Sequence, residues 1–256
     1  MTDASRGAGG AIMGTRGTGR VRTAVVWDVL RRTVDELSGS GGRCLEVIDA
    51  GGGTGGFAVP LAGLGHRVTV VDASPDALAA LERRAAEAGV TVDSVQGDAG
   101  DLLDLVGAGK ADLVLCHSVL EYTEDPAAAM AALAGTVRPG GAVSVLAAGQ
   151  VAAAVHRALA GHFDEARRAL GDPAGRWGER DPVPLRFTRR MLTDLVTGAG
   201  LRVAELHGVR IFADLVSGGV LDDPEAVQAL IELETAAAVH PVLRDLATQL
   251  HVLARR

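Results

Sequence analysis

An acidic residue followed by a run of glycines is the most distinctive chemical feature of the sequence. Residues 49–56 read DAGGGTGG, so Asp49 stands just before a glycine-rich turn. Glycine lets a backbone turn sharply and approach a ligand closely, because it has no Cβ. A carboxylate and free backbone N–H groups can bind the hydroxyl, amino and carboxylate groups of a small polar ligand. These residues predict a binding loop for a nucleotide-like molecule.

Three more polar residues stand just after short apolar runs. They are Asp72, Asp98 and His117. In an open parallel sheet, ligands bind in the crevice beyond the carboxyl ends of the strands. If each apolar run is a strand, these three residues and Asp49 should line one site.

The glycine spacing is compatible with two kinds of cofactor site. Gly51, Gly53 and Gly56 fit the dinucleotide fingerprint, with an acid about 20 residues further on for a ribose hydroxyl. The same stretch reads Asp49-x-Gly51-x-Gly53-x-Gly55, which resembles motif I of class I S-adenosylmethionine (SAM) methyltransferases. An acid before the first glycine suits a ligand with an ammonium group, which SAM carries and a pyrophosphate lacks. The methyltransferase interpretation is therefore favoured over a dehydrogenase.

Apolar patterns along the chain indicate the elements that carry these residues. Short apolar runs predict buried strands, and apolar residues at helical spacing predict helices. The expected strands cover residues 45–48, 67–71, 90–95, 112–116, 142–147, 201–207 and 249–254. The expected helices cover residues 21–37, 57–64, 75–88, 102–106, 126–137, 151–170, 189–197 and 224–239, and residues 138–141 predict a turn. This alternation predicts a doubly wound α/β fold with a mostly parallel sheet.

Length and composition favour one large domain. The chain has 256 residues, of which 48% are hydrophobic, enough for a single α/β core. No apolar stretch approaches about 18 residues, and the N-terminus lacks the apolar centre of a signal peptide, so we expect a cytoplasmic protein. Cys44 and Cys116 fall in expected strands and are interpreted as small core residues without a disulfide.

The net charge of −7 is unevenly distributed along the chain. Residues 44–150 are strongly acidic, whereas residues 1–43 and 151–190 are net basic. This asymmetry is compatible with an anionic substrate beneath basic segments, and equally with solvated arginines. We expect residues 1–20 to be a flexible N-terminal arm and residues 21–256 to form a single domain. Within that domain, residues 151–190 are predicted to be a helical, substrate-side cover inserted after the fifth strand.

Several stretches together resemble one enzyme family. The glycine motif, Asp72, residues 97–99 (GDA) and residues 138–141 (RPGG) are similar to class I SAM methyltransferases. Patches within residues 19–27, 117–126, 208–214, 232–235 and 250–255 resemble the bacterial tRNA 5-carboxymethoxyuridine methyltransferases more closely. The resemblance implies a seven-stranded, Rossmann-like sheet with an antiparallel last strand, and SAM as the cofactor. It is weakest at residues 147–190, on the expected substrate side.

The same resemblance implies roles for the residues of the cofactor half. Asp72 would accept both ribose hydroxyls, Asp98 would accept the adenine amino group, and the Ala99 N–H would face a ring nitrogen. Asp49 would organise the glycine loop from behind. The glycines that would let the backbone approach the methionine part are Gly51, Gly52 and Gly53.

Three other residues are candidates nearer the reacting groups. Arg22 resembles the family's arginine that clamps the SAM carboxylate, and its planar fork fits a carboxylate bidentately. His117 is expected to contact cofactor or substrate, and Arg210 to pair with the acceptor carboxylate. An ionised carboxylate acceptor needs no general base, whereas a hydroxyl or amine acceptor would need one, with His117 or Glu121 as candidates.

The predicted function is SAM-dependent methyl transfer, with the carboxylate of 5-carboxymethoxyuridine in tRNA as the acceptor that the resemblance implies. A methyltransferase for an anionic small metabolite is the alternative, and a non-catalytic SAM- or nucleotide-binding protein is the alternative of another class. We expect neither a metal nor a membrane partner. If tRNA is the substrate, phosphates should meet the arginines at positions 157, 167, 168, 176, 180, 186, 189 and 190.

Overall fold

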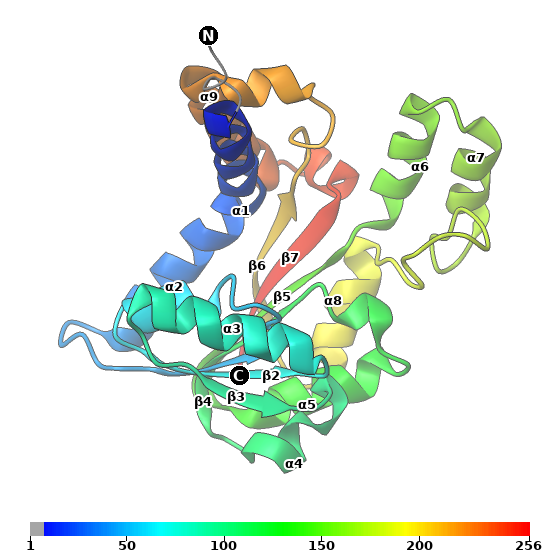
Figure 1. The fold of residues 1–256 in the computed structure, drawn as a ribbon. Coiled ribbons are helices and arrows are strands. Elements are labelled where there is room, and N and C mark those ends of the chain that lie inside the picture. Colours follow the sequence, from blue (N-terminus) through cyan, green and yellow to red (C-terminus); the bar gives the residue numbers. More distant parts are fainter. Residues whose placement is uncertain (1–7) are drawn as a thin grey trace, which may run out of the picture.

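A computed structural model describes residues 8–256, with side chains described from Gly19 onward, and centres on one sheet (Figure 1). The strands are β1 (Glu46–Ala50), β2 (Arg67–Asp72), β3 (Asp93–Gln96), β4 (Ala111–His117), β5 (Val137–Ala148), β6 (Arg202–Val209) and β7 (Gln249–Arg255). They lie in the order β3-β2-β1-β4-β5-β7-β6. Strand β7 is antiparallel to both its neighbours, and the other pairs are parallel. The predicted seven-stranded, mostly parallel sheet is confirmed.

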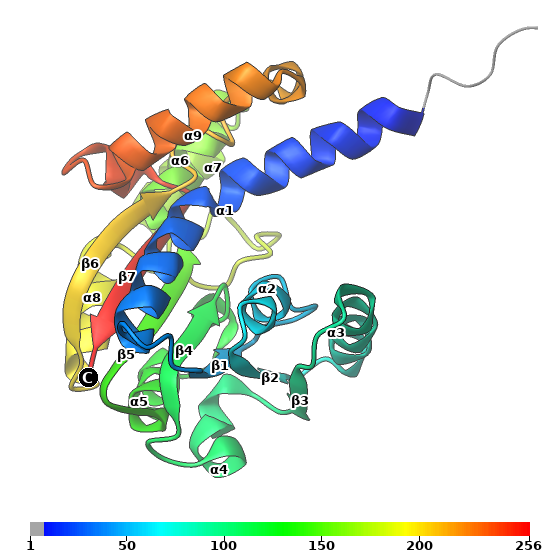
Figure 2. The same cartoon turned by 90° about the vertical axis from the view of Figure 1, so that its left-hand side faces the viewer.

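Helices cover both faces of the sheet (Figure 2). They are α1 (Ala8–Ser38), α2 (Ala58–Gly63), α3 (Pro75–Ala88), α4 (Leu102–Val106), α5 (Pro126–Thr136), α6 (Gln150–Leu159), α7 (Phe163–Gly171), α8 (Arg189–Gly198) and α9 (Pro224–Ala238). One face buries α1, α2 and α3 through side chains such as Val26, Leu61 and Leu81. The other buries α5 and α8 through Met130 and Leu192. Burial of these apolar faces is the main favourable contribution to folding.

Helix α3 illustrates how local sequence sets an element's bounds. The Ser74 hydroxyl accepts a hydrogen bond from the Ala77 N–H at 3.2 Å, and Pro75 occupies the first turn. Gly89 ends the helix with a left-handed φ of +67°, which glycine adopts without a steric cost. The predicted bounds of this helix are confirmed. The helix therefore begins directly after β2 and leaves Asp72 at the end of that strand.

The N-terminal elements differ from the prediction in two places. Helix α1 begins at Ala8, not at residue 21, while residues 1–7 of the predicted arm lie outside the described residues. Cys44 is exposed, because β1 starts at Glu46, so its predicted place in the core is wrong. Cys116 lies in β4 and is buried, as predicted.

Two corrections concern the region around β5. Residues 138–141 are not a separate turn: they belong to β5, where Val137 pairs with Ala111 and a register shift follows. Gly140 absorbs this irregularity with a φ of +81°. The single helix predicted over residues 151–170 is two helices, because Gly161, at φ +79°, breaks the segment between α6 and α7.

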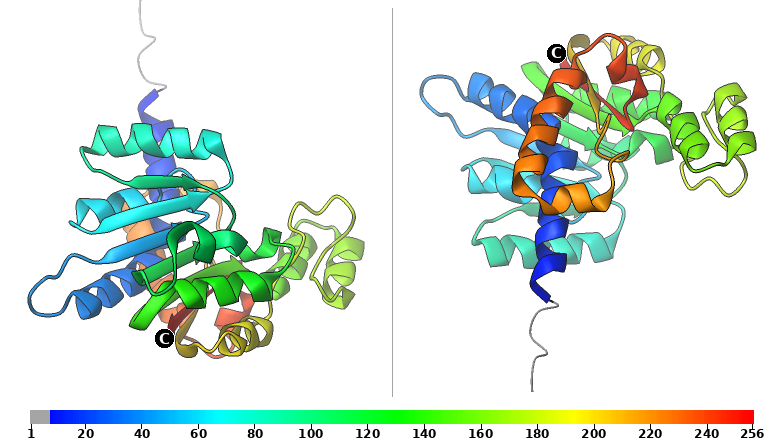
Figure 3. Two further views of the ribbon diagram at one scale, coloured as in Figure 1. Left: turned by 90° about the horizontal axis from the view of Figure 1, so that it is seen from below. Right: turned by 90° about the horizontal axis from the view of Figure 1, so that it is seen from above.

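Helices α6 and α7 pack against each other beyond the end of β5 and stand apart from the sheet, while α9 packs against α1 (Figure 3). The carboxyl ends of β1, β4 and β6 and the start of β7 meet at this same edge. Residues far apart in sequence are therefore brought together here. None of the helices in the described part of the chain is both long and apolar enough to cross a lipid bilayer.

Candidate active site

The glycine loop after β1 is shaped by contacts that exclude side chains. Gly51 has a φ of +73°, and a Cβ there would lie 2.2 Å from Val119 Cγ2. A Cβ at Gly52 would lie 2.7 Å from the Cγ of Asp49, whose carboxyl packs beneath the loop. Both distances are far below a normal carbon–carbon contact, so larger residues would displace the loop. The loop thus presents bare backbone toward its open side.

Asp72 secures the opposite side of this loop. Its two carboxylate oxygens accept hydrogen bonds from the Gly53 N–H at 2.8 Å and the Ser74 N–H at 2.9 Å. The Gly97 N–H donates to the Asp72 carbonyl at 3.1 Å, which brings the segment after β3 beside β2. Asp98 is exposed and makes no side-chain cap, whereas Ala99 is buried. The ends of β2 and β3 therefore form an open shelf beside the loop.

A cavity of about 270 Å³ lies against the glycine loop, and we call it the first cavity. Its lining includes the predicted site residues Arg22, Asp49, Gly51, Gly52, His117 and Arg210. The other predicted site residues, Gly53, Asp72, Asp98 and Ala99, do not line it and belong to the adjoining loop and shelf. The structure thus places the ten predicted residues along one edge of the sheet.

Asp49 is the most strongly perturbed acid at this edge. Its carboxyl is 2% exposed, and burial, followed by the negative charge of Asp72, raises its pKa to about 7. A buried carboxylate is unfavourable unless a positive or hydrogen-bonding partner reaches it. Asp49 therefore favours a ligand that carries a cation.

One carboxylate holds two predicted arginines. Asp214 lies 2.6 Å from Arg210 Nη2 and 3.5 Å from Arg22 Nη2, and it accepts a hydrogen bond from Thr248 Oγ1 at 2.9 Å. Burial raises the pKa of Asp214, but the hydrogen bond and charge of Arg210 outweigh it and leave the pKa below its usual value. Asp214 therefore keeps both guanidinium groups at the rim of the first cavity.

A second cavity of about 310 Å³ adjoins the first, and Ser118, Arg210 and Gln249 line both. Gln249 Nε2 donates to Ser118 Oγ at 2.8 Å, and Arg210 Nη1 donates to Gln249 Oε1 at 3.5 Å. These three residues form a shared wall between the cavities. The far side of the second cavity comes from α6 and the loop after α7.

The second cavity combines three cationic groups with one buried acid. Arg210, Arg157 and Arg186 line it; Arg157 lies 3.8 Å over the Trp177 ring, and Arg186 pairs with Asp181 at 2.6 Å. Burial raises the pKa of Glu121, also in the lining, to about 7, and its Oε2 has no hydrogen-bond partner among the described residues. The cavity is therefore suited to an anionic group.

Comparisons with known proteins agree with this geometry. Residues 48–145 match the family model described as a methyltransferase domain. The chain is 30% identical, over 240 residues, to the tRNA 5-carboxymethoxyuridine methyltransferase of Escherichia coli O157:H7, a match that covers 93% of this chain and 89% of that protein. The chain belongs to the class I methyltransferase family.

Two further likenesses are weaker, the first in the length that it covers and the second in sequence identity. The ubiquinone biosynthesis O-methyltransferase of Aromatoleum aromaticum is 36% identical over 110 residues, or 43% of this chain and 46% of that protein. The magnesium protoporphyrin IX methyltransferase of Synechocystis PCC 6803, solved with bound S-adenosylhomocysteine (SAH), has a TM-score of 0.58 at 17% identity and covers 99% of this chain and 90% of that chain. At this identity the structural likeness shows the fold alone.

The methyltransferase has SAM as its cofactor, and the first cavity fits that molecule. The bare backbone at Gly51 and Gly52 leaves room for close approach, and Asp49 offers a buried acid to a cationic ligand. SAM carries both a sulfonium and an ammonium group. The dehydrogenase and the non-catalytic binding protein are therefore set aside.

His117 is not poised for proton transfer in this methyltransferase. Its Nε2 lies 2.8 Å from Ser144 Oγ, its ring meets Phe57 edge-on at 4.7 Å, and burial lowers its pKa to about 3. The ring is therefore neutral at physiological pH. Its Nδ1 is buried without a partner among the described residues.

Sequence reasoning missed three residues of the shared wall and its support. Ser118, Gln249 and Asp214 were not predicted as site residues. Asp214 lies in a patch that resembles the tRNA enzymes, so that resemblance could have identified it. No local signal marks Gln249, because its place depends on β7 lying beside β5. Within the described chain, histidine, cysteine and acidic side chains form no group of three that could hold a metal ion.

Proposed function

We propose that this methyltransferase transfers the methyl group of SAM to the carboxylate of 5-carboxymethoxyuridine in tRNA. The observation that carries the proposal is the likeness to the tRNA 5-carboxymethoxyuridine methyltransferases, which extends over 93% of the chain. It includes the substrate side as well as the cofactor half. Such an enzyme would act in the cytoplasm on a polyanionic partner.

In this proposal the cofactor lies along the loop and the shelf. Asp72 accepts the ribose hydroxyls, and Asp98 with Ala99 binds the adenine. The glycine loop, Gly51 to Gly53, faces the methionine part, and Asp49 stands behind it. Arg22 supports the cofactor carboxylate from α1, an assignment favoured by its place in the lining of the first cavity.

Arg210 is the proposed contact for the acceptor carboxylate. It lies in the shared wall, so its guanidinium can reach a group in the second cavity beside the cofactor. Transfer forms a bond between a carboxylate oxygen and the methyl carbon while the carbon–sulfur bond breaks, which yields an ester and SAH. An ionised acceptor loses no proton, so alignment in the site supplies the main acceleration. Arg210 is then the catalytic residue that fixes that alignment, and His117 contacts the cofactor.

The cover after β5 is the proposed binding surface for tRNA. Arg168 and Arg180 are exposed on α7 and the loop that follows. Arg186 cannot serve a surface phosphate, because it is 9% exposed and paired with Asp181, so that part of the phosphate prediction is wrong. We propose residues 151–190 as the substrate-side insertion of a single domain that spans residues 21–256.

The direct test is methylation of purified tRNA that carries 5-carboxymethoxyuridine, followed by nucleoside mass spectrometry. Wild-type protein should form the methyl ester, and Arg210→Ala should reduce kcat/KM at least tenfold, because a charge-assisted pair is lost. Arg202→Ala is the matched control, since Arg202 is exposed at the start of β6, the strand that ends just before Arg210, and lies outside both cavities. Absence of ester formation by the wild type at low salt would contradict the proposal.

A small carboxylic or phenolic metabolite is the second candidate acceptor. It is favoured by the likeness to a ubiquinone biosynthesis O-methyltransferase, although that match covers only 43% of the chain. The acidic net charge of −7 also suits a small ligand better than a polyanion. Turnover of such metabolites without turnover of tRNA would establish this alternative.

A further inference from the structure

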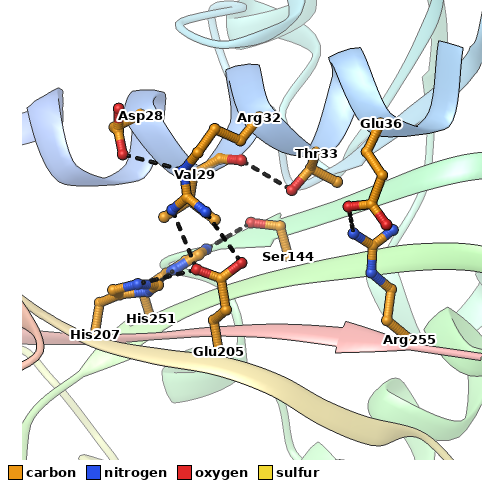
Figure 4. Close-up of polar contacts among 10 residues, drawn as sticks. All are labelled: Asp28, Val29, Arg32, Thr33, Glu36, Ser144, Glu205, His207, His251 and Arg255. Atoms are coloured by element: carbon orange, nitrogen blue, oxygen red, sulfur yellow. Dashed lines mark hydrogen bonds and ion pairs between the residues drawn. The ribbon is translucent and has the colours of Figure 1, made fainter. Parts of the chain in front are cut away.

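A chain of polar contacts runs through the core from His117 to the outer strand of the sheet: three hydrogen bonds and, at its outer end, one histidine–carboxylate contact. His117 Nε2 lies 2.8 Å from Ser144 Oγ, which lies 2.8 Å from His251 Nε2. His251 Nδ1 lies 3.3 Å from His207 Nδ1, and His207 Nε2 lies 3.4 Å from Glu205 Oε2. Figure 4 shows the part from Ser144 to Glu205, beneath α1. We call these five residues the relay chain.

The relay chain crosses four neighbouring strands on the face of the sheet that α1 covers. His117 lies on β4, Ser144 on β5 and His251 on β7, and the last two residues lie on β6. At its outer end, Arg32 of α1 donates to the two Glu205 oxygens at 3.4 and 3.1 Å. At its inner end, His117 lines the first cavity. The relay chain therefore connects the ion pair between Arg32 of α1 and Glu205 of β6 with the cofactor site.

The positions of the N–H protons on the three histidines follow from the Glu205 end of the relay chain. An ionised carboxylate only accepts hydrogen bonds, so Glu205 requires an N–H at His207 Nε2. Burial lowers the pKa values of His207, His251 and His117, so each ring is neutral at pH 7.5 and carries one N–H. His207 Nδ1 is then an acceptor, which makes His251 Nδ1 the donor and His251 Nε2 an acceptor.

The same logic continues to the cofactor site. Ser144 donates its hydroxyl proton to His251 Nε2, so its oxygen accepts the N–H of His117 Nε2. His117 Nδ1 is left with a lone pair. This atom is buried, and it is the ring nitrogen of the relay chain without a partner among the described residues.

The opposite donor-to-acceptor direction along the relay chain is unfavourable while His207 is neutral. Reversal would place the Nε2 lone pair of His207 against the Glu205 carboxylate. Only a doubly protonated His207 removes this conflict, because it donates from both nitrogens. The charged groups that act on His207 are Glu205 on its own strand, Arg32 and Asp28 on α1, and Arg244 on the segment before β7.

We propose that Glu205, His207, His251 and Ser144 are positioning residues that hold His117 as its Nε2–H tautomer, so that Nδ1 accepts a hydrogen bond from a donor group of the bound cofactor. The ammonium of the methionine part is the donor best matched to the first cavity, which Asp49 also lines. The inference concerns cofactor binding, and it is independent of the identity of the methyl acceptor.

A purely structural role explains the relay chain less well. Burying three polar side chains costs free energy, and apolar residues of similar size would pack between α1 and the sheet without that cost. His207, His251 and Ser144 are each 5% exposed or less, and each is satisfied within the chain. The ring nitrogen that lacks a hydrogen-bond partner among the described residues, His117 Nδ1, is at the cofactor end of the relay chain.

The tautomer can be read directly from ¹⁵N-histidine chemical shifts of the cofactor-free protein at pH 7.5, with His117→Gln used for assignment. We expect a protonated Nε2 and an unprotonated Nδ1 at His117. Glu205→Gln should raise the Nδ1–H fraction severalfold, because an amide can accept from or donate to His207. Glu36→Gln is the control: it is an exposed acid on α1 that pairs with Arg255 outside the relay chain.

Two results would overturn the proposal. One is a protonated Nδ1 at His117 in the wild type at pH 7.5. The other is a His117 tautomer that does not respond to Glu205→Gln in a protein with native thermal stability. SAH titration gives an independent readout: Ser144→Ala should weaken SAH binding about tenfold and remove the shift of the His117 Nδ1 signal on binding. Unchanged SAH affinity and an unchanged shift would also reject the positioning role.

Discussion

Ser118 and Arg210 face each other across one glutamine and share an unusual backbone conformation. They have φ values of +58° and +62°, and they are the non-glycine residues with positive φ in the part of the chain that the structure describes. Both line the two cavities, and Gln249 bonds to each side chain. Such backbone costs on the order of 1–3 kcal/mol per residue and collects at functional sites. The shared wall between the two cavities therefore carries backbone strain.

Asp72→Asn is expected to weaken SAH binding by about 2 kcal/mol, because hydrogen bonds to an ionised group are lost. Isothermal titration calorimetry would measure this. Asp76→Asn is the control, since Asp76 is an exposed acid in the first turn of α3, beyond the strand end that carries Asp72. Equal affinities for wild type and Asp72→Asn would remove Asp72 from the cofactor site.

Asp49 should make cofactor affinity depend on pH. Its pKa of about 7 means that the carboxyl is mostly neutral at pH 5.5 and mostly ionised at pH 8. If the cation of the ligand needs the ionised form, SAH affinity should rise about 30-fold between these values, in proportion to the ionised fraction. Calorimetric titration across the range measures it, and Asp49→Asn should give a much flatter profile.

The raised pKa of Asp49 also predicts how the free energy of unfolding changes with pH. The pKa of Asp49 is raised above its usual value, so its contribution to stability is present at pH below about 4 and is lost as pH rises through 7. Without ligand, Asp49→Asn should therefore be more stable than wild type at pH 8, and by less at pH 5. Urea unfolding at both values is the measurement, and the reverse ordering would contradict the burial of an ionisable Asp49.

Gly51→Ala should disrupt the cofactor loop, whereas Gly63→Ala should not. A methyl group at Gly51 would meet Val119 at 2.2 Å in a left-handed conformation, while nothing lies within 4 Å of a Cβ at Gly63, which is exposed at the end of α2 and lies outside the first cavity. We expect the first change to cost more than about 2 kcal/mol of unfolding free energy and to reduce SAH affinity. Similar melting temperatures and affinities for the two variants would refute this account of the loop.

Glu234→Gln should destabilise the segment that follows Arg210. The buried Glu234 carboxylate accepts N–H bonds from Ile211, Phe212 and Ala213 at 2.9, 2.8 and 2.7 Å. An amide has one acceptor oxygen, so at least one buried N–H loses its partner, at a cost of about 1–3 kcal/mol. Urea unfolding measures this, and exposed Glu232→Gln on the same helix should change stability by less than about 0.5 kcal/mol.

Methylation of tRNA should fall steeply with salt, because each phosphate contact contributes nearly one unit to a log–log slope. Arg168→Ala and Arg180→Ala should each reduce the slope by about one. Arg84→Ala, an exposed change on α3 away from the cover, should leave it unaltered. Kinetics across a salt series measure the slopes, and three equal slopes would exclude the cover as the phosphate-binding surface.

The sequence alone determined the order of the elements and the position of the cofactor loop. These features depend on local signals: apolar period, the cap at Ser74, and the spacing of Asp49, Gly51 and Gly53. Local signals also had limits. The break at Gly161 was missed because alanine-rich helix composition continues across it, and the position of Cys44 was wrong because a strand's first residue is weakly marked.

Only the tertiary structure decided which residues meet across the sheet. The last strand in sequence, β7, lies between β5 and β6, and this places His251 between Ser144 and His207. The same insertion brings Gln249 to Ser118, while the packing of α1 brings Arg22 to Asp214. Such partners are separated by 44 to 192 residues, and no local preference encodes their contact, because it exists only once the strand order is fixed.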